Sequence, residues 1–373
     1  MITRDTIQRL LEREPGGNPV LSLYLDMSVN SDNKRTHHIF LNQQRAQFPS
    51  LSSDRDQHHR EPIGEALDRA ERWVEDNFDE SNKGVAVFTE IGGDWLEAVQ
   101  VPVPLRNRLV IADQPAVSQL YELLTRDRRY GIVLVDRVHM RVLRYHLGVL
   151  ERILEVEPDV YPSPHDVQKG GTAQKNYQKF KAEEARQVFR TFAQDLSELD
   201  RSYIIQHYIL LGTEENVSHF REFLPASIQE RVLYTGQGEV DGPDSEVLDR
   251  LADFFSQQFS QEEQRALEEL HDRVRNRYYA TAGVRDTLEQ LQEGKVGTLL
   301  IARDLESAGG QCVKCGFFIA AANSRCPYCG GSLRDVDLIE TMVRMAAQQE
   351  VDVRFVEAQP MSDLDGVGGL LRF

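Results

Sequence analysis

The four cysteines of the chain lie in one short stretch near the end of the sequence. They form two Cys-x-x-Cys-Gly pairs, Cys312/Cys315 and Cys326/Cys329, separated by ten residues. A two-residue gap lets both thiolates turn toward one ion, and the glycine that follows allows the backbone turn. Four thiolates make a closed tetrahedral site, which predicts a structural zinc ion; iron in a rubredoxin-like site, or no metal, are the alternatives. Such a metal folds a small lobe rather than catalysing a reaction, and no cysteine remains to act as a nucleophile.

A second candidate site is a glycine pair, Gly170-Gly171, at the start of a basic segment. Between Gln168 and Arg190 there are six basic and two acidic residues, a local charge of +4. The basic residues are Lys169, Lys175, Lys179, Lys181, Arg186 and Arg190. Such a stripe is suited to phosphate contact, and the alternative is a loop followed by a solvated helix face. A phosphate-cradling P-loop is a poor fit because no Gly-Lys-Ser/Thr follows a strand here.

Composition restricts the class of protein. The chain has 373 residues, with 43 Lys and Arg against 60 Asp and Glu, giving a net charge of −17. This charge argues against a protein that coats nucleic acid by bulk attraction, although a local basic patch can still contact it. No apolar run approaches the roughly 18–20 residues of a membrane span, and no apolar stretch follows the N-terminus. We therefore expect a cytoplasmic protein with no membrane partner, and clustered cysteines agree with a reducing compartment.

The pattern of apolar residues divides the chain into three α/β segments, 1–125, 126–260 and 261–373. The first is expected to contain a strand at 20–25, a helix at 38–48, a loop at 50–62, a helix at 63–78 and a hairpin of 84–88 with 95–99.

The second segment places the glycine pair between a sheet and a long helix. We expect strands at 130–135, 140–145 and 149–156, a loop at 162–172, a helix at 174–196, a strand at 208–213 and a helix over 217–223. Asp136 follows the first of these strands. A nuclease that uses two metals needs clustered carboxylates, and no partner set is evident, so we interpret Asp136 as a turn residue.

The third segment alternates helices and strands around the cysteines. We expect helices at 262–277, 284–292 and 338–348 and strands at 296–301, 351–356 and 368–373. This order predicts a small α-β-α sandwich with a zinc-bearing insertion at 310–332.

Several stretches, in order, resemble the archaeal and eukaryotic class-one peptide chain release factors and their paralogue Pelota. Tyr130-Gly-Ile-Val-Leu-Val-Asp136 resembles the opening strand of that family's middle domain. The family's Gly-Gly-Gln-Ser-Ala-x-Arg-Phe-x-Arg loop aligns without a gap with residues 170–179. Gly283-Val-Arg-Asp-Thr-Leu288 and Gly366-Val-Gly-Gly-Leu-Leu-Arg-Phe373 are similar to the start and end of its C-terminal domain, and the four-cysteine insertion resembles archaeal members. The resemblance covers roughly residues 128–373.

The resemblance implies a tRNA-shaped, three-domain α/β protein that fills the ribosomal A site as a monomer. Its domains would be an N-terminal decoding-site type, an RNase-H-like middle domain and a C-terminal sandwich like the kink-turn-binding ribosomal proteins. The middle-domain loop would contact rRNA at the peptidyl-transferase centre, and the C-terminal domain would face a translational GTPase such as elongation factor Tu. The contacting residues implied are Lys169, Gly170, Gly171, Thr172, Gln174, Lys175, Lys179 and Lys181.

Two departures from the family pattern bear on activity. The family glutamine that helps to place the hydrolytic water is replaced by Thr172, whose hydroxyl is shorter and lacks the amide's donor and acceptor pair. The stop-codon-reading Asn-Ile-Lys-Ser is absent. We therefore expect no catalytic residues and a ribosome-binding factor of the family's bacterial branch, acting in hibernation or rescue. The alternatives are peptide release or peptidyl-tRNA hydrolysis by a variant loop, and a protein-protein adaptor without ribosome contact.

Overall fold

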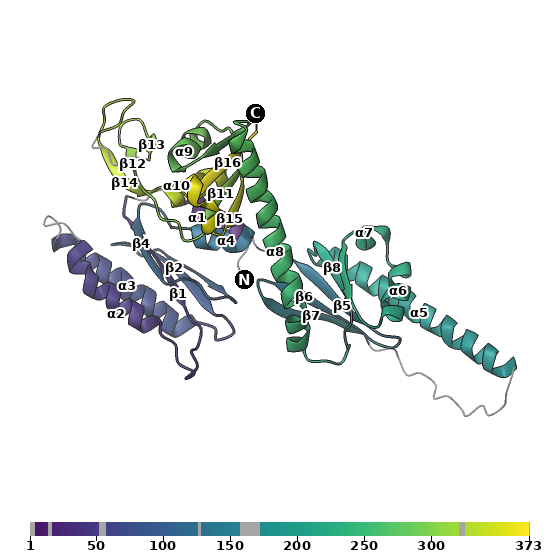
Figure 1. Ribbon diagram of the computed structural model, residues 1–373. Coiled ribbons are helices and arrows are strands. Elements are labelled where there is room, and N and C mark those ends of the chain that lie inside the picture. Colours follow the sequence, from purple (N-terminus) through teal and green to yellow (C-terminus); the bar gives the residue numbers. More distant parts are fainter. Residues whose placement is uncertain are drawn as a thin grey trace. The chain divides into compact units, whose positions relative to one another are not determined.

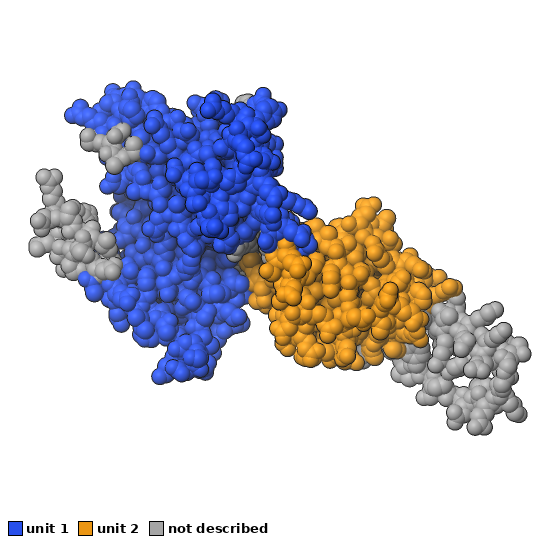
Figure 2. Space-filling model, viewed as in Figure 1, with its two compact units in different colours: residues 1–126, 258–373 blue, residues 127–257 orange. Residues whose placement is uncertain are grey.

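The computed structural model describes residues 4–13, 17–51, 57–125, 128–156, 172–320 and 325–372. The chain forms two compact units, one of residues 1–126 with 258–373 and the other of residues 127–257 (Figure 2). Both are mixed α/β, and the described strands form sheets of four, four, three and five strands (Figure 1). No helix within these described ranges is both long enough and apolar enough to cross a bilayer.

The N-terminal part of the first unit is an antiparallel sheet covered by two helices. The strands are β1 (Val20–Asp26), β2 (Gly84–Glu90), β3 (Leu96–Val101) and β4 (Arg108–Ala112), in the order β3-β2-β1-β4. The helices α2 (His37–Leu51) and α3 (Gln57–Asn77) contribute Leu41, Leu67 and Ala70 to a core shared with this sheet. The predicted strand at 20–25, the helices and the hairpin are confirmed; the short helices α1 (Arg4–Glu12) and α4 (Ser118–Thr125) are additions.

The predicted loop at 50–62 is wrong at both ends. Helix α2 continues to Leu51, and α3 begins at Gln57 with Pro62 inside it. A proline removes one backbone hydrogen bond from a helix and restricts the residue before it. Near the start of a 21-residue helix this is a local cost, and the apolar stripe that follows holds the helix on the sheet.

The second unit is a five-stranded mixed sheet with helices on both faces. Its strands are β5 (Tyr130–Val135), β6 (Met140–His146), β7 (Val149–Val156), β8 (His207–Leu211) and β9 (Val232–Gly236), in the order β7-β6-β5-β8-β9. The pairs β5/β8 and β8/β9 are parallel, and the other pairs are antiparallel. The expected strands are confirmed, and β9 and the one-turn helix α7 (Ala226–Gln229) are additions.

Each face of this sheet is covered by its own helices. On one face, Phe189, Phe192 and Leu196 of α5 (Thr172–Ser202) and Phe220 of α6 (Glu214–Phe223) join a buried core. On the other face, the ring of Tyr145 stacks on Phe255 of α8 (Asp244–Arg275) with centroids 4.0 Å apart. Helix α8 begins eighteen residues before the predicted start at Glu262 and passes from the second unit into the first.

The C-terminal part of the first unit is a second four-stranded sheet, β10-β16-β11-β15. The strands are β10 (Ala280–Ala282), β11 (Val296–Ala302), β15 (Asp352–Val356) and β16 (Val367–Leu371). The helices are α9 (Val284–Gln292), α10 (Leu338–Gln348) and a 3-10 turn, η1 (Gln359–Leu364). These agree closely with the predicted elements.

The adjacent glycines of β16 explain how helices pack on both faces of this sheet. A Cβ at Gly368 would lie 2.5 Å from Cδ2 of Leu270 in α8, and a Cβ at Gly369 would lie 3.3 Å from Cγ2 of Thr287 in α9. Neighbouring residues of a strand point to opposite faces. Helix α8 therefore covers one face and α9 the other, which is the predicted α-β-α arrangement.

The N-terminal and C-terminal parts of the first unit are joined by a half-buried cluster of charges. Arg108 of β4 donates to Glu340 and to Asp337 at the start of α10, both at 2.8 Å. Glu340 also accepts the backbone N–H groups of Val117, at 2.7 Å, and Ser118, at 2.9 Å. The carboxylate therefore lies at the N-terminus of α4, where the helix dipole favours a negative charge.

Two further contacts enclose this cluster. Arg344 of α10 donates to the carbonyl oxygens of Leu11, at 2.8 Å, and Pro115, at 2.6 Å. The hydroxyl of the fully buried Tyr24 donates to the carbonyl oxygen of Ala116. Burial, followed by the charge of Glu340, raises the pKa of Tyr24 well above its ordinary value. The residues that form hydrogen bonds with α10 thus come from α1, β4 and the segment that leads into α4.

We expect Gly368→Ala to destabilise the protein by about 1–3 kcal/mol, because the new methyl group would overlap the buried Leu270. The measurement is the free energy of unfolding in urea, followed by far-UV circular dichroism. Gly64→Ala in α3 is the matched control, since nothing lies within 4 Å of its Cβ position. It should leave stability unchanged or raise it by up to about 1 kcal/mol. Equal stability of the two variants would contradict this packing.

We expect Glu340→Ala to cost about 2–4 kcal/mol, because it leaves Arg108 and two helix N–H groups without their main acceptor. The fluorescence of Trp73 and Trp95, which both lie in the N-terminal part, reports its unfolding in urea. The control is Glu289→Ala, which removes an exposed i,i+4 pair with Arg285 and should cost less than about 0.5 kcal/mol. A Glu340→Ala variant as stable as this control would show that the cluster does not hold the two parts together.

Candidate functional site

The structure brings all four cysteines to one point. The four sulfur atoms lie within 4.8 Å of one another, with Cys312 Sγ 3.3 Å from Cys329 Sγ and Cys315 Sγ 3.7 Å from Cys326 Sγ. Two of the four residues, Cys312 and Cys326, are buried. This spacing fits four thiolates around one tetrahedral ion, whose bonds to sulfur are about 2.3 Å long for zinc.

The two halves of this cluster have the same backbone structure. The N–H of Gly316 donates to the carbonyl oxygen of Cys312 at 2.8 Å, and the N–H of Gly330 donates to that of Cys326 at 2.9 Å. Both glycines have positive φ, 74° and 72°. A side chain at either position would be strained, which explains why glycine follows each Cys-x-x-Cys pair.

Backbone N–H groups also point at the sulfurs. The N–H of Cys315 lies 3.4 Å from Cys312 Sγ, and this contact lowers the pKa of Cys312 to about 6. A lowered pKa favours the thiolate, which is the form that binds metal. The donor set therefore fits a closed metal site with no position left for a substrate.

The cysteines are carried by a small sheet inserted between β11 and α10. Its strands are β12 (Ala308–Cys312), β13 (Phe318–Ile319) and β14 (Leu333–Asp337), in the order β13-β12-β14. The side chain of Gln292 in α9 donates to the carbonyl oxygen of Phe318 at 3.0 Å and accepts its N–H at 2.8 Å. The lobe has a core of only a few side chains around Ile319 and the cysteines, so a metal ion would supply the stability that burial cannot.

The basic segment begins helix α5. Thr172 is the first residue of the helix, and Gln174, Lys175, Lys179 and Lys181 follow within it. Lys175 and Lys179 are four residues apart, one turn of the helix. Lys169, Gly170 and Gly171 lie outside the described residues, as do the side chains of residues 172–185. The predicted contacts of this segment stay a prediction.

Asp136 is a turn residue, as interpreted from the sequence. Its Oδ1 accepts the N–H groups of Val138, at 2.7 Å, and His139, at 2.6 Å. These hydrogen bonds close the turn between β5 and β6.

Sequence reasoning missed the Arg108–Glu340 cluster, because its members are more than 220 positions apart in the chain. The only local signal was Asp337 before the apolar helix 338–348, a helix N-cap whose carboxylate accepts the N–H of Ile339 at 2.8 Å.

One family model matches part of the chain. Residues 115–255 match the family model of bacterial archaeo-eukaryotic release factor family 10. No curated protein matches the chain.

Solved structures that resemble the chain include an archaeal translation termination factor, aRF1, at 17% identity, covering 100% of this chain and 99% of that chain with a TM-score of 0.28. A ribosome-bound archaeal Pelota, described together with ABCE1, is 13% identical over 100% of this chain and 94% of that chain, with a TM-score of 0.44. Pelota of Archaeoglobus fulgidus is 13% identical over 78% of this chain and 79% of that chain, with a TM-score of 0.33.

We expect the purified protein to carry about one zinc ion per chain, measured by inductively coupled plasma mass spectrometry. Cys326→Ser should lose the ion and expose residues 308–337 to proteolysis, because the lobe has little core of its own. Lys314→Ala, in the same turn but bearing no ligand atom, should keep both the metal and the protection. A Cys326→Ser protein with an unchanged cleavage pattern would contradict a structural role for the metal.

Proposed function

We propose that the chain is a ribosome-associated factor of release factor/Pelota type, because residues 115–255 match the model of bacterial archaeo-eukaryotic release factor family 10. We place its binding in the A site, with the segment around Gly170-Gly171 directed to the peptidyl-transferase centre. The family match is the observation that carries this proposal. The three-domain division at about residues 125 and 260 and a cytoplasmic location belong to the same proposal.

The binding is proposed to be non-hydrolytic, in ribosome hibernation or rescue. The supporting residue is Thr172, at the position of the glutamine in the family loop. Its hydroxyl can donate one hydrogen bond and accept others, but it is shorter than a glutamine side chain and lacks an amide. Placement of an attacking water depends on distances of about 3 Å, so a shorter group in the same backbone position cannot hold it at the ester.

Local charge supports contact with rRNA. The chain as a whole has a net charge of −17, which repels phosphate at long range. Lys175, Lys179 and Lys181 bring positive charge to the first turns of α5. Binding would therefore be directed by this segment, and it would weaken as salt rises because phosphate contacts release counterions.

The cysteine cluster is proposed to hold zinc, and the lobe that carries it lies beside the C-terminal sheet. In this proposal the zinc has a structural role, and the C-terminal part faces a translational GTPase. Among the structural neighbours, yeast Dom34 is described as interacting with Hbs1, and ribosome-bound Pelota is described together with ABCE1.

Co-sedimentation with vacant bacterial 70S ribosomes over a series of salt concentrations tests this proposal. We expect Lys179→Glu to weaken binding about tenfold and to reduce the slope of log affinity against log salt by about 1. Lys83→Glu, an exposed lysine before β2, makes the same charge change and should bind like the unaltered protein.

Equal effects of the two substitutions would show that bulk charge, not the α5 segment, governs binding. Lack of sedimentation with 70S particles would favour an adaptor without ribosome contact. Release of peptide from peptidyl-tRNA by the unaltered protein, in the same preparation, would overturn the non-hydrolytic part alone.

A further inference from the structure

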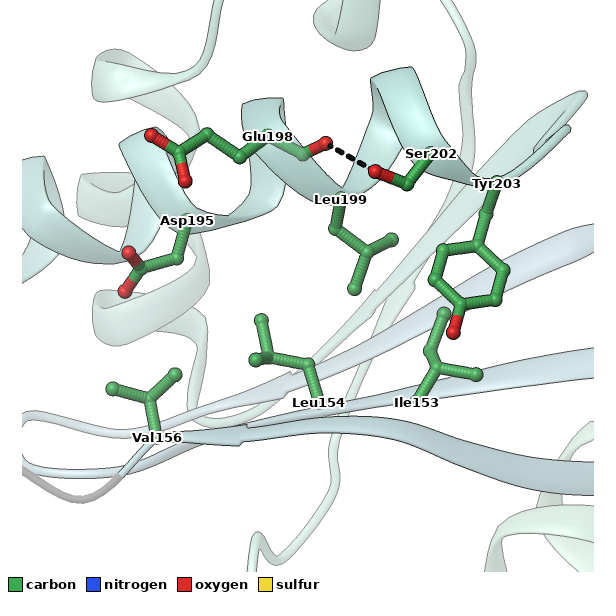
Figure 3. A pocket seen from close by; sticks show the side chains of 8 residues that line it. All are labelled: Ile153, Leu154, Val156, Asp195, Glu198, Leu199, Ser202 and Tyr203. Atoms are coloured by element: carbon green, nitrogen blue, oxygen red, sulfur yellow. Dashed lines mark hydrogen bonds between the residues drawn. The ribbon is translucent and has the colours of Figure 1, made fainter.

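The second unit has an open groove between the edge strand β7 and helix α5 (Figure 3). Its volume is about 390 Å³. The floor is formed by apolar side chains of β7, and the wall by residues of α5, two of them acidic. The lining residues are Ile153, Leu154, Val156, Asp195, Glu198, Leu199, Ser202 and Tyr203.

A β-bulge makes the floor of this groove apolar. Val142 of β6 pairs with Leu154, but the next residue, Leu143, pairs with Arg152, so Ile153 has no partner in β6. An extra residue breaks the alternation of a strand. Ile153 and Leu154 therefore both point toward α5, as Figure 3 shows, although regular alternation would turn one of them away.

The groove opens at an edge strand, which is paired on one side among the described strands. Strand β7 is the first in the order β7-β6-β5-β8-β9, and β6 is its only neighbour among the described strands. An edge of this kind can accept hydrogen bonds from an added extended segment. The apolar floor and the open edge together suit a protein segment better than a small molecule, because a small molecule usually binds in a pocket that encloses it on most sides.

The two charged side chains that line the groove are both acidic. Asp195 and Glu198 lie three residues apart on α5, and within the described part of the chain neither carboxylate forms an ion pair. Burial, followed by the charge of Glu198, raises the pKa of Asp195. A cation also borders the groove: Arg144 lies over the ring of the lining residue Tyr203 at 5.5 Å, and it pairs with Glu151.

We propose that this groove binds a basic amphipathic segment of a partner protein. Apolar side chains of the segment would lie on Ile153 and Leu154, and its Lys or Arg side chains would pair with Asp195 and Glu198. A nucleic acid or an anionic membrane does not fit, because phosphate would meet two like charges. The proposal goes beyond the proposed ribosomal role and does not depend on the α5 basic segment.

Fluorescence anisotropy with a defined probe tests the proposal. The probe is a fluorescein-labelled 14-residue peptide in which Leu and Lys alternate, so that an extended strand presents Leu on one face, and its control has Glu in place of Lys. The full-length protein should bind the Lys peptide and not the Glu peptide. Asp195→Asn with Glu198→Gln should weaken binding at least tenfold, and Ile153→Ala at least threefold. Ile153→Ala is chosen because that residue has no strand partner, so its loss leaves the β6/β7 pairing in place.

Asp249→Asn with Asp253→Asn is the matched control, since it removes two exposed carboxylates of α8 in the same unit. This protein should bind the Lys peptide within twofold of the unaltered one. Equal weakening by the two double variants would mean attraction by the net negative charge, and would overturn the proposal. Failure of the unaltered protein to bind, binding unaffected by any groove variant, or binding of a single-stranded RNA of the same length at Asp195 and Glu198 would also overturn it.

Discussion

The arrangement of the first unit depends on one carboxylate, that of Glu340. It accepts hydrogen bonds from the Arg108 guanidinium, the N–H groups of Val117 and Ser118, and the Ser118 hydroxyl. The Glu340 side chain is only 13% exposed, and that of Arg108 is 21% exposed, so both charges are largely removed from water. A desolvated charge is tolerated when each of its lone pairs or protons has a partner. The hydrogen-bond donors belong to the N-terminal part, and the accepting carboxylate belongs to α10. The hydrogen bonds that this charge requires therefore hold the two parts together.

The small lobe that carries the four cysteines, residues 308–337, is stabilised in a different way. Its sheet has three short strands and a core of few side chains, and the two knuckles are closed by glycines with positive φ. Such a lobe buries too little apolar surface to fold by hydrophobic burial alone. Bonds to a metal ion held by the four cysteines would supply what is missing. The Gln292 side chain attaches the lobe to α9.

The sequence predicted most of the regular elements, because strands such as 130–135 and helices such as 338–348 have strong apolar periodicity. It also predicted that the four cysteines meet, since the knuckle spacing is local. It failed at 50–62, where a charged stretch rich in Ser and His was interpreted as a loop. It also failed at the start of α8, whose first turns pack on the sheet of the second unit.

Features that depend on distant residues could not be predicted from the sequence. The Arg108–Glu340 contact joins two segments that are far apart in the sequence. The apolar pattern of neither segment indicates that it contacts the other. The β7/α5 groove depends on a bulge that arises only when β6 and β7 are paired. Asp195 and Glu198 look in the sequence like ordinary solvated helix residues, and only the paired strands show that they border an apolar surface.

The proposed function depends most on where this chain binds. The most direct measurement is cryo-electron microscopy of the purified protein added to vacant bacterial 70S ribosomes. The account predicts density for the chain in the A site, with the segment around Gly170-Gly171 at the peptidyl-transferase centre. An empty A site on ribosomes saturated with the protein would contradict it.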